Sequence, residues 1–225
     1  MAGGGTPRQS EVVDAAFRQQ VRGPKLLYVP FARNDEPAIR LRELHATFAP
    51  EIDRIEVWED PYESPRPLPM YDAVYIDGGN TFQLMATVRS ADLGPALANY
   101  LDIGGLIYGM SAGAILFGAT IAPAAFFDAN DAGLVDYSGL GLLASAAIWP
   151  HYLPEHDGEL CALAVREGHE VIGVAEEAAV HFLDGQFTAL GTGAAVLFRP
   201  NDLQPEPIGP AGPPLSPDLH PRLVQ

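Results

Sequence analysis

Short, continuous apolar runs alternate along most of the chain with segments in which apolar residues recur at helical spacing. Continuous apolar runs of this kind are typical of strands buried on both faces. They predict strands at residues 25–30, 53–59, 73–77, 105–109, 145–150 and 170–175. The helical patterns lie between several of these runs, at residues 37–48, 81–88, 94–101, 112–118 and 157–167. Because strands alternate with helices, we expect an α/β fold with a mainly parallel sheet flanked by helices.

The pattern changes toward the C-terminus. Asp184 and Gly185 separate two apolar runs, which indicates a β-hairpin, and we expect this hairpin and residues 194–198 to form an antiparallel edge. The segment from Pro200 onward is rich in proline. We therefore expect one α/β catalytic domain over residues 1–199, followed by a Pro-rich C-terminal extension over residues 200–225.

The charge balance narrows the choice of partners. The chain has 29 acidic and 13 basic residues and a formal net charge of −16, which argues against a nucleic acid or an anionic membrane as partner. No apolar run reaches the ~18 residues of a membrane span, and the first residues lack the apolar middle of a signal peptide, so we expect a cytoplasmic protein. The single cysteine, Cys161, excludes an internal disulfide and lies in a helical pattern with no base beside it, which favours a packing role.

The stretch YGMSAGA at residues 108–114 places a serine between two glycines, where a predicted strand meets a predicted helix. Gly109, Ser111 and Gly113 form the G-x-S-x-G pattern of a nucleophile elbow. In such an elbow the hydroxyl projects at the end of the strand, and the helix N-terminus adds donors for a developing oxyanion. The motif alone is equally compatible with an N-cap serine whose flanking glycines permit close packing.

A serine nucleophile needs a base, and His151 is the best candidate. It follows the apolar run AAIWP, at the edge where parallel sheets place their chemistry. Nearby His156 and Asp157 also suggest metal ligands, but the spacing fits no helix-borne pair, so we expect no metal. A second glycine cluster, DGGN at residues 77–80, again lies between a strand and a helix, where its N–H groups can face an anion.

Together these motifs resemble the aspartyl dipeptidase family, peptidase E. This family of serine peptidases is related to cyanophycinase and has a class I glutamine-amidotransferase-like fold. The resembling stretches occur in the family's order and are VPFA (29–32), IDGGNTFQL (76–84), YGMSAGA (108–114), WPHY (149–152) and VIGVAEE (171–177). GGNTFQL followed by SAGA is a far more specific combination than either motif alone.

The resemblance implies a Ser-His-Glu triad and no cofactor. Ser111 would be the nucleophile, His151 the base, and Glu176 the carboxylate that orients the imidazole. The family's Pro-Glu-Gly turn reads Ala175-Glu176-Glu177 in this chain, so Glu177 remains an alternative for the carboxylate.

The resemblance also implies where the reacting carbonyl would be held. The N–H groups of Gly79 and Ala112 would be the oxyanion donors. Asp128, in a long connection over residues 120–140, falls near an aspartate of the family, and Asn80 belongs to the DGGN turn. We expect both side chains to contribute to substrate binding. Loops as long as this connection are often functional.

The expected substrate is a dipeptide or short peptide, with a preference for N-terminal aspartate as a further expectation. A bound aspartate side chain needs a cation, because an unpaired buried charge is costly. In some family members an arginine follows the histidine, but the matching stretch PEHDGELCAL has neither arginine nor lysine. Arg33 and Arg89 are the basic residues that we place near the active edge, and Arg33 is the preferred candidate.

Two other functions remain open. An α/β-hydrolase esterase would order its triad as serine, acid and histidine, whereas here the carboxylate candidates follow His151. A non-catalytic small-molecule binding module could keep the elbow as architecture alone, since a fold does not determine a function. Both a monomer and a homodimer are compatible with the sequence.

Overall fold

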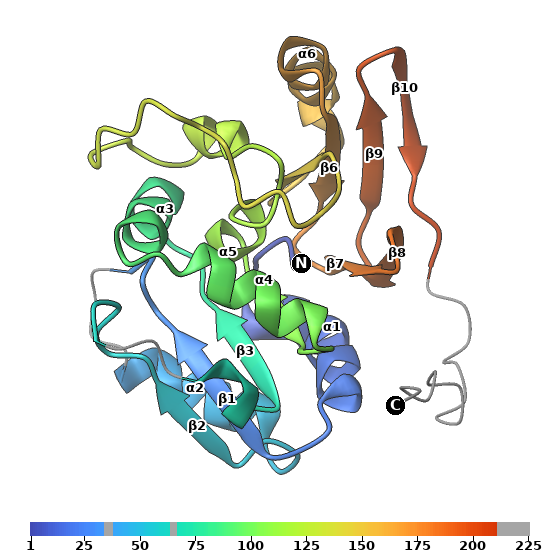
Figure 1. Cartoon of the computed structure of the whole chain (residues 1–225). Coiled ribbons are helices and arrows are strands. Elements are labelled where there is room, and N and C mark those ends of the chain that lie inside the picture. Colours follow the sequence, from blue (N-terminus) through green and yellow to red (C-terminus); the bar gives the residue numbers. More distant parts are fainter. Residues whose placement is uncertain (34–37, 64–66, 211–225) are drawn as a thin grey trace, which may run out of the picture.

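Figure 1 shows the protein as a computed structural model, which describes residues 1–33, 38–63 and 67–210. The helices and strands follow one another in this order: α1 (Pro7–Gln20), β1 (Lys25–Val29), α2 (Ala38–Phe48), β2 (Arg54–Val57), η1 (Leu68–Met70), β3 (Ala73–Ile76), α3 (Thr81–Ser90), α4 (Gly94–Asp102), β4 (Ile107–Gly109), α5 (Ala112–Ile115), η2 (Ala122–Phe126), β5 (Ala146–Trp149), η3 (Pro154–His156), α6 (Asp157–Glu167), β6 (Glu170–Val174), β7 (Ala178–Leu183), β8 (Gln186–Gly191), β9 (Ala195–Arg199) and β10 (Asp202–Pro207).

Within the described residues, the strands form two four-stranded sheets and a separate hairpin. The first sheet has the order β2-β1-β3-β4, and all its neighbours are parallel. In the second sheet, ordered β10-β9-β6-β5, β5 and β6 are parallel while β9 is antiparallel to both β6 and β10. The predicted α/β fold with a mainly parallel sheet is confirmed.

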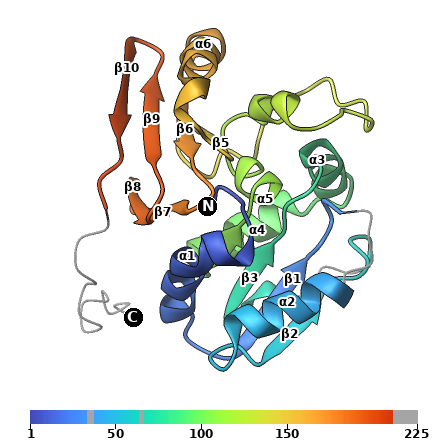
Figure 2. The same ribbon diagram turned by 180° about the vertical axis from the view of Figure 1, so that it is seen from behind.

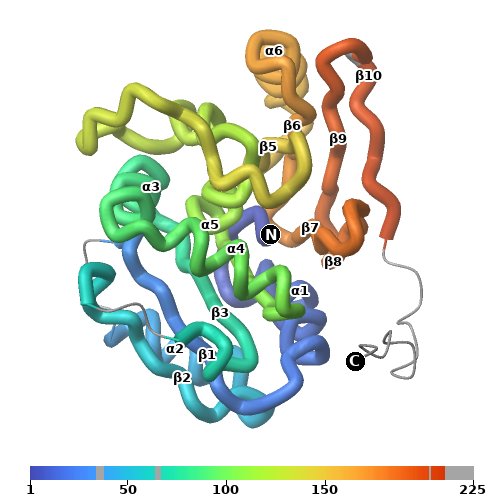
Figure 3. Tube along the Cα trace, in the orientation of Figure 1, coloured from blue at the N-terminus to red at the C-terminus, as the bar shows by residue number. Residues whose placement is uncertain are grey.

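The first residues of the chain join the two sheets. The Ala2 N–H donates to the Gly109 carbonyl at the end of β4, with an N···O distance of 2.8 Å. The Gly3 N–H donates to the Ala178 carbonyl at the start of β7, at 3.0 Å. In Figure 3 the N-terminus accordingly lies in the interior of the molecule, beside β7.

Helices cover both faces of the first sheet because successive strand side chains point to opposite sides. Leu26 and Tyr28 of β1 pack with α1 and α2, which Figure 2 shows in front of the strands. Leu27 and Val29 pack with α3 and α4 on the opposite face. Helix α6 packs on the second sheet through Leu160 and its neighbours. No helix among the described residues is long and apolar enough to cross a membrane.

The predicted strands and helices up to α6 are present, and their ends differ from the predictions by small amounts. The helix predicted over residues 112–118 ends at Ile115. The carbonyl of Leu116 instead accepts a hydrogen bond from the Leu140 N–H, and that of Phe117 accepts one from the Leu142 N–H. The long loop thus bonds the carbonyl groups of the two residues that follow the helix, which would otherwise continue it.

The C-terminal strands differ from the expected antiparallel edge. The predicted hairpin is present as β7 and β8, but these strands pair with each other and not with β9. The edge of the second sheet is β10, in the segment that composition assigned to a Pro-rich extension. Pro205 and Pro207 fit an edge strand, where one side of the backbone needs no partner. The rest of the predicted extension, residues 211–225, lies outside the described residues, as does residue 37 of the helix predicted over 37–48.

Helix α1 was not predicted, although its start carries a recognisable signal. Thr6 precedes the helix, Pro7 occupies the first helical position, and Gln9 follows at the third. A Thr-x-x-Gln sequence with proline after the threonine is typical of a helix N-terminus. The η2 turn inside the long loop was also missed, because a single 3₁₀ turn leaves no periodic pattern.

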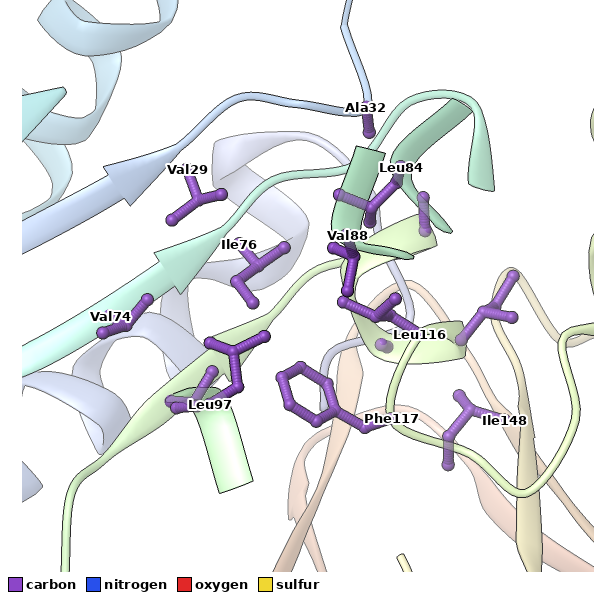
Figure 4. Close-up of a cluster of buried hydrophobic side chains, with 14 of the residues drawn as sticks. Val29, Ala32, Val74, Ile76, Leu84, Val88, Leu97, Leu116, Phe117 and Ile148 are labelled. Carbon is purple, nitrogen blue, oxygen red and sulfur yellow. The ribbon is translucent and has the colours of Figure 1, made fainter. Parts of the chain in front are cut away.

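The largest apolar cluster lies where the two sheets meet, and Phe117 is among its fully buried members. Figure 4 shows its ring between Leu97 of α4 and Ile148 of β5. Phe117 has no solvent-exposed surface, so truncation of this side chain leaves a cavity that the closely packed surroundings cannot fill.

We expect Phe117→Ala to lower the free energy of unfolding by about 3–5 kcal/mol. Urea denaturation followed by circular dichroism measures this loss. Val135→Ala, at a side chain that is 97% exposed, is the control and should change stability by no more than about 0.5 kcal/mol. Equal effects of the two substitutions would contradict the assignment of Phe117 to the core.

Candidate active site

Ser111 occupies the sharp corner between β4 and α5. Its φ of 49° and ψ of −107° are dihedral angles that residues other than glycine rarely adopt. The flanking glycines allow the corner to be this tight. A Cβ on Gly113 would lie 2.3 Å from the Ile76 carbonyl oxygen, and one on Gly109 would lie 2.5 Å from the Gly113 carbonyl oxygen. The corner therefore packs against β3 at a distance that only glycine permits.

His151 lies directly opposite this serine. It follows the end of β5 with a φ of 53°, and its backbone N–H donates to the Gly3 carbonyl at 3.0 Å. Its Nε2 is 2.9 Å from the Ser111 Oγ, which is a hydrogen-bond distance. The Phe127 ring packs edge-on against the imidazole with a centroid distance of 5.7 Å. The structure therefore brings together the two side chains that the sequence suggested as nucleophile and base.

Glu176 completes a line of three side chains. It lies just after β6, and its Oε1 is 3.2 Å from the His151 Nδ1. Its Oε2 accepts a hydrogen bond of 2.6 Å from the Gln9 side-chain amide. Glu177, the alternative carboxylate, accepts from the same amide at 3.2 Å. Of the two successive carboxylates, Glu176 is the one in hydrogen-bond contact with the imidazole.

A glycine-rich turn at the start of the chain packs against His151 and Glu176. Gly4 has a φ of +118°, and a Cβ there would lie 2.3 Å from the His151 Cε1. Gly5 has a φ of +92°, and its Cβ would lie 3.0 Å from the Glu176 Cβ. The turn supports the imidazole and the carboxylate through direct backbone contact.

The DGGN turn lies on the other side of Ser111. A Cβ on Gly78 would lie 3.2 Å from the Ser111 Cβ, and one on Gly79, whose φ is +143°, would lie 2.2 Å from the Ala32 carbonyl oxygen. Within the described part of the chain, neither the Gly79 N–H nor the Ala112 N–H donates a hydrogen bond.

A buried carboxylate and two arginine side chains stabilise the DGGN turn. Asp77 is 1% exposed, and its Oδ1 accepts a hydrogen bond of 2.9 Å from the Gly78 N–H. Its Oδ2 accepts from the Tyr28 hydroxyl at 2.7 Å and lies 3.3 Å from the Arg40 Nε and 3.7 Å from an Arg33 nitrogen. Burial and the Asp77 carboxylate raise the pKa of Tyr28, so its hydroxyl stays protonated and donates.

Asn80 and Asp128 are close together, and their polar atoms bind the protein itself. The Asn80 Oδ1 accepts from the Gln83 N–H at 2.9 Å, and its Nδ2 donates to the Ala129 carbonyl at 2.8 Å. The Asp128 Oδ2 accepts from the Thr81 N–H at 2.8 Å. These contacts tie the long loop to the start of α3.

The two arginines singled out from the sequence have different surroundings. Arg89 donates to the carbonyls of Asp136 and Ser138 at 2.9 and 2.7 Å, so it fastens the long loop to α3. Arg33 has a side chain that is 32% exposed and lines a cavity of about 680 Å³, together with Glu59 and other residues at the ends of β1 and β2. The residue before it, Ala32, is the one that touches the DGGN turn.

The side chains considered as metal ligands have other partners. His156 Nδ1 accepts from the Leu153 N–H at 3.2 Å, and Asp157 accepts from the Tyr152 hydroxyl at 2.7 Å. No cluster of three His, Cys, Asp or Glu side chains suited to a metal occurs in the part of the chain that the structure describes. Cys161 lies on α6, where burial and then the Asp157 charge raise the pKa of its thiol, which disfavours the nucleophilic thiolate.

Comparison with known proteins decides the family. The model of peptidase family S51 matches residues 1–190. The chain belongs to this family. Peptidase E of Salmonella newport (strain SL254) is 32% identical over 186 residues, which cover 78% of this chain and 76% of that protein. Peptidase E of Salmonella typhi is 33% identical over 188 residues, with the same shares covered.

Solved structures show the same fold. A Listeria monocytogenes EGD-e protein assigned to peptidase E superposes with a TM-score of 0.67 at 18% identity, over 85% of this chain and 96% of that one. A peptidase from an acI-B1 actinobacterium gives a TM-score of 0.68 at 17% identity, over 94% and 93% of the two chains. The resemblance to the peptidase E family is confirmed, and the protein is a serine peptidase of this S51 family.

The contact between Glu176 and His151 can be tested by substitution. Glu176→Gln should lower kcat/KM by a factor on the order of 10³–10⁴, because an amide in place of the carboxylate no longer favours the required imidazole tautomer. Glu177→Gln is the matched control and should have only a small effect, since Glu177 contacts Gln9 and not His151. Dipeptide hydrolysis by the two purified variants provides the measurement. The reverse ranking would move the carboxylate role to Glu177.

Proposed function

We propose that this S51 peptidase hydrolyses dipeptides and short peptides through a triad of Ser111, His151 and Glu176. The observation that carries this proposal is the line of contacts from the Glu176 carboxylate through the imidazole to the Ser111 Oγ, with distances of 3.2 and 2.9 Å. Nucleophile, base and orienting acid stand in the arrangement that activates a serine hydroxyl.

The reaction follows from the roles of these groups. The Ser111 Oγ attacks the scissile carbonyl while the His151 Nε2 takes the hydroxyl proton, and Glu176 stabilises the imidazolium that forms. The imidazolium then gives its proton to the leaving amine. A water molecule, deprotonated by the same imidazole, hydrolyses the acyl-serine and releases the N-terminal product.

The tetrahedral intermediate places a negative charge on the former carbonyl oxygen. We assign its stabilisation to the N–H groups of Gly79 and Ala112, which have no acceptor among the described residues. Gly79 lies on the turn that touches the Ser111 side chain, and Ala112 is the residue after the serine. Backbone donors that are fixed before the reaction stabilise such a charge without a cost of reorganisation.

The long loop favours small substrates. Phe127, near its middle, packs against the imidazole, while Asp128, Asn80 and Arg89 fasten the loop to α3. A site bordered in this way admits the end of a short chain more readily than a segment of a folded protein. We therefore expect dipeptides and short peptides as substrates.

Arg33 is our candidate for recognition of an N-terminal aspartate. Arg89, the other arginine that the sequence placed near this edge, donates to two carbonyl groups of the long loop. Arg33 lines a cavity at the ends of β1 and β2, and its guanidinium lies 3.7 Å from buried Asp77 of the DGGN turn, which holds it near the active edge. In a protein with a net charge of −16, a carboxylate substrate needs a local cation of this kind.

The triad is tested by removal of its members. Ser111→Ala and His151→Ala should each lower kcat by at least about 10⁴-fold and leave the fold intact, because both side chains lie at strand ends outside the core. A fluorophosphonate probe should label the wild-type protein and not Ser111→Ala. Ser145→Ala, at an exposed serine just before β5, is the control and should be fully active. Substantial turnover by folded Ser111→Ala would disprove the mechanism.

The specificity is tested with a panel of Xaa-Leu dipeptides. Arg33→Gln should lower kcat/KM for Asp-Leu by about 10–100-fold, since hydrogen bonds to a charged group contribute about 1.5–3 kcal/mol, while Ala-Leu hydrolysis stays nearly constant. Arg54→Gln, at a side chain that is 65% exposed, is the matched control. An aspartyl preference that survives Arg33→Gln would exclude Arg33 from this role, and no aspartyl preference would remove the specificity but leave the triad in place.

A further inference from the structure

Gln9 links helix α1 to the carboxylates beside the imidazole. Its Nε2 donates to the Glu176 Oε2 at 2.6 Å and lies 3.2 Å from the Glu177 Oε1. Its Oε1 accepts from the backbone N–H of Thr6 at 3.0 Å and from the Thr6 hydroxyl at 2.8 Å. Both ends of the amide are therefore engaged, one with the start of α1 and the other with two carboxylates.

The partners determine which way the amide points. A backbone N–H can only donate, so the atom that faces the Thr6 N–H must be the amide oxygen. The NH₂ group then faces Glu176 and Glu177, whose ionised carboxylates can only accept. The helix start thus fixes a two-proton donor against the carboxylate pair.

The Gln9 NH₂ group restricts the orientation of the Glu176 carboxylate. The Glu176 side chain is 39% exposed, and the terminal torsion of a glutamate is broad, so contact with the imidazole alone would leave the group free to turn toward water. Glu177, the next residue, adds a like charge that repels it. An amide that donates to both carboxylates offsets this repulsion and leaves the Glu176 Oε1 directed at the His151 Nδ1.

We propose that Gln9 is a positioning residue for the peptidase reaction, acting on His151 through Glu176. Among the described residues, the Gln9 amide bonds Thr6, Glu176 and Glu177 and reaches neither Ser111 nor His151. It holds the carboxylate in the orientation that keeps the imidazole aligned with the Ser111 Oγ. This inference rests on the proposed triad and adds to it a fourth side chain, contributed by the N-terminal helix.

The substitution Gln9→Glu separates this role from helix capping. A glutamate at this position still accepts from the Thr6 N–H and suits a helix N-terminus, so helix α1 should be retained, and any loss of stability comes from repulsion by the two neighbouring carboxylates. It loses the NH₂ donor and sets a third carboxylate against the other two. We expect kcat to fall by about 10–100-fold with little change in KM, because the lost contacts serve the reaction and not substrate binding. An unchanged kcat in the folded variant would overturn the proposal.

A double-mutant cycle tests the route through Glu176. Gln9→Ala should lower kcat by about 10-fold in the wild-type background and have almost no effect in a Glu176→Gln background, since residues that act as a unit are not additive. Gln20→Ala, on the same helix and with its side-chain amide bonded to the Ala16 carbonyl within the described residues, is the matched control and should leave kcat unchanged. Equal losses in the two backgrounds would show that Gln9 does not act through Glu176 and would overturn the proposal.

The same measurements separate failure of this inference from failure of the proposed function. If Glu176→Gln loses activity and Gln9→Glu does not, the triad stands and the role of Gln9 is disproved. If Glu176→Gln is fully active, the triad as drawn is wrong, and the role of Gln9 is disproved with it. Loss of kcat in both, with Gln9→Glu still folded by circular dichroism, supports the proposal.

Discussion

The site depends on how two separate sheets are held together. Ser111 follows the last strand of the first sheet, whereas His151 and Glu176 follow strands of the second. Two backbone carbonyls fix the distance between Ser111 and His151. The Ala2 carbonyl accepts from the Ser111 N–H at 3.1 Å, and the Gly3 carbonyl accepts from the His151 N–H at 3.0 Å. Adjacent residues in one segment thus set the register between serine and imidazole, and the 2.9 Å contact between the two side chains follows from it.

Close backbone approach explains why glycines surround this contact. Gly4 touches the imidazole, Gly78 touches the serine side chain, and Gly79 touches the carbonyl of Ala32. At Gly4 and Gly79 the backbone also has a positive φ, which costs a larger residue conformational strain. The reactive groups are therefore supported by main chain, which is less mobile than side chains would be and places N–H groups beside the serine.

Charges of both signs lie close to the site, although the protein as a whole is acidic. Buried Asp77 draws Arg33 and Arg40 toward the DGGN turn, so cationic groups are concentrated beside the site despite the net charge of −16. On the opposite side, Glu176 and Glu177 share the amide of Gln9. The serine lies between a region with arginine side chains and a region with carboxylates, which suits a peptide substrate that carries charge at its ends.

The sequence by itself determined the α/β class, most helices and strands, and the positions of the serine corner and the strand-end histidine. Short stretches of sequence determine these features, because apolar periodicity and turn chemistry depend on residues that are close along the chain. Only the tertiary structure decided which of Glu176 and Glu177 meets the imidazole, and that Gln9, 167 residues earlier, binds both. It also decided that Arg89 holds a loop while Arg33 lines a cavity. Such contacts depend on how distant segments pack, and a single sequence carries no local pattern that records them.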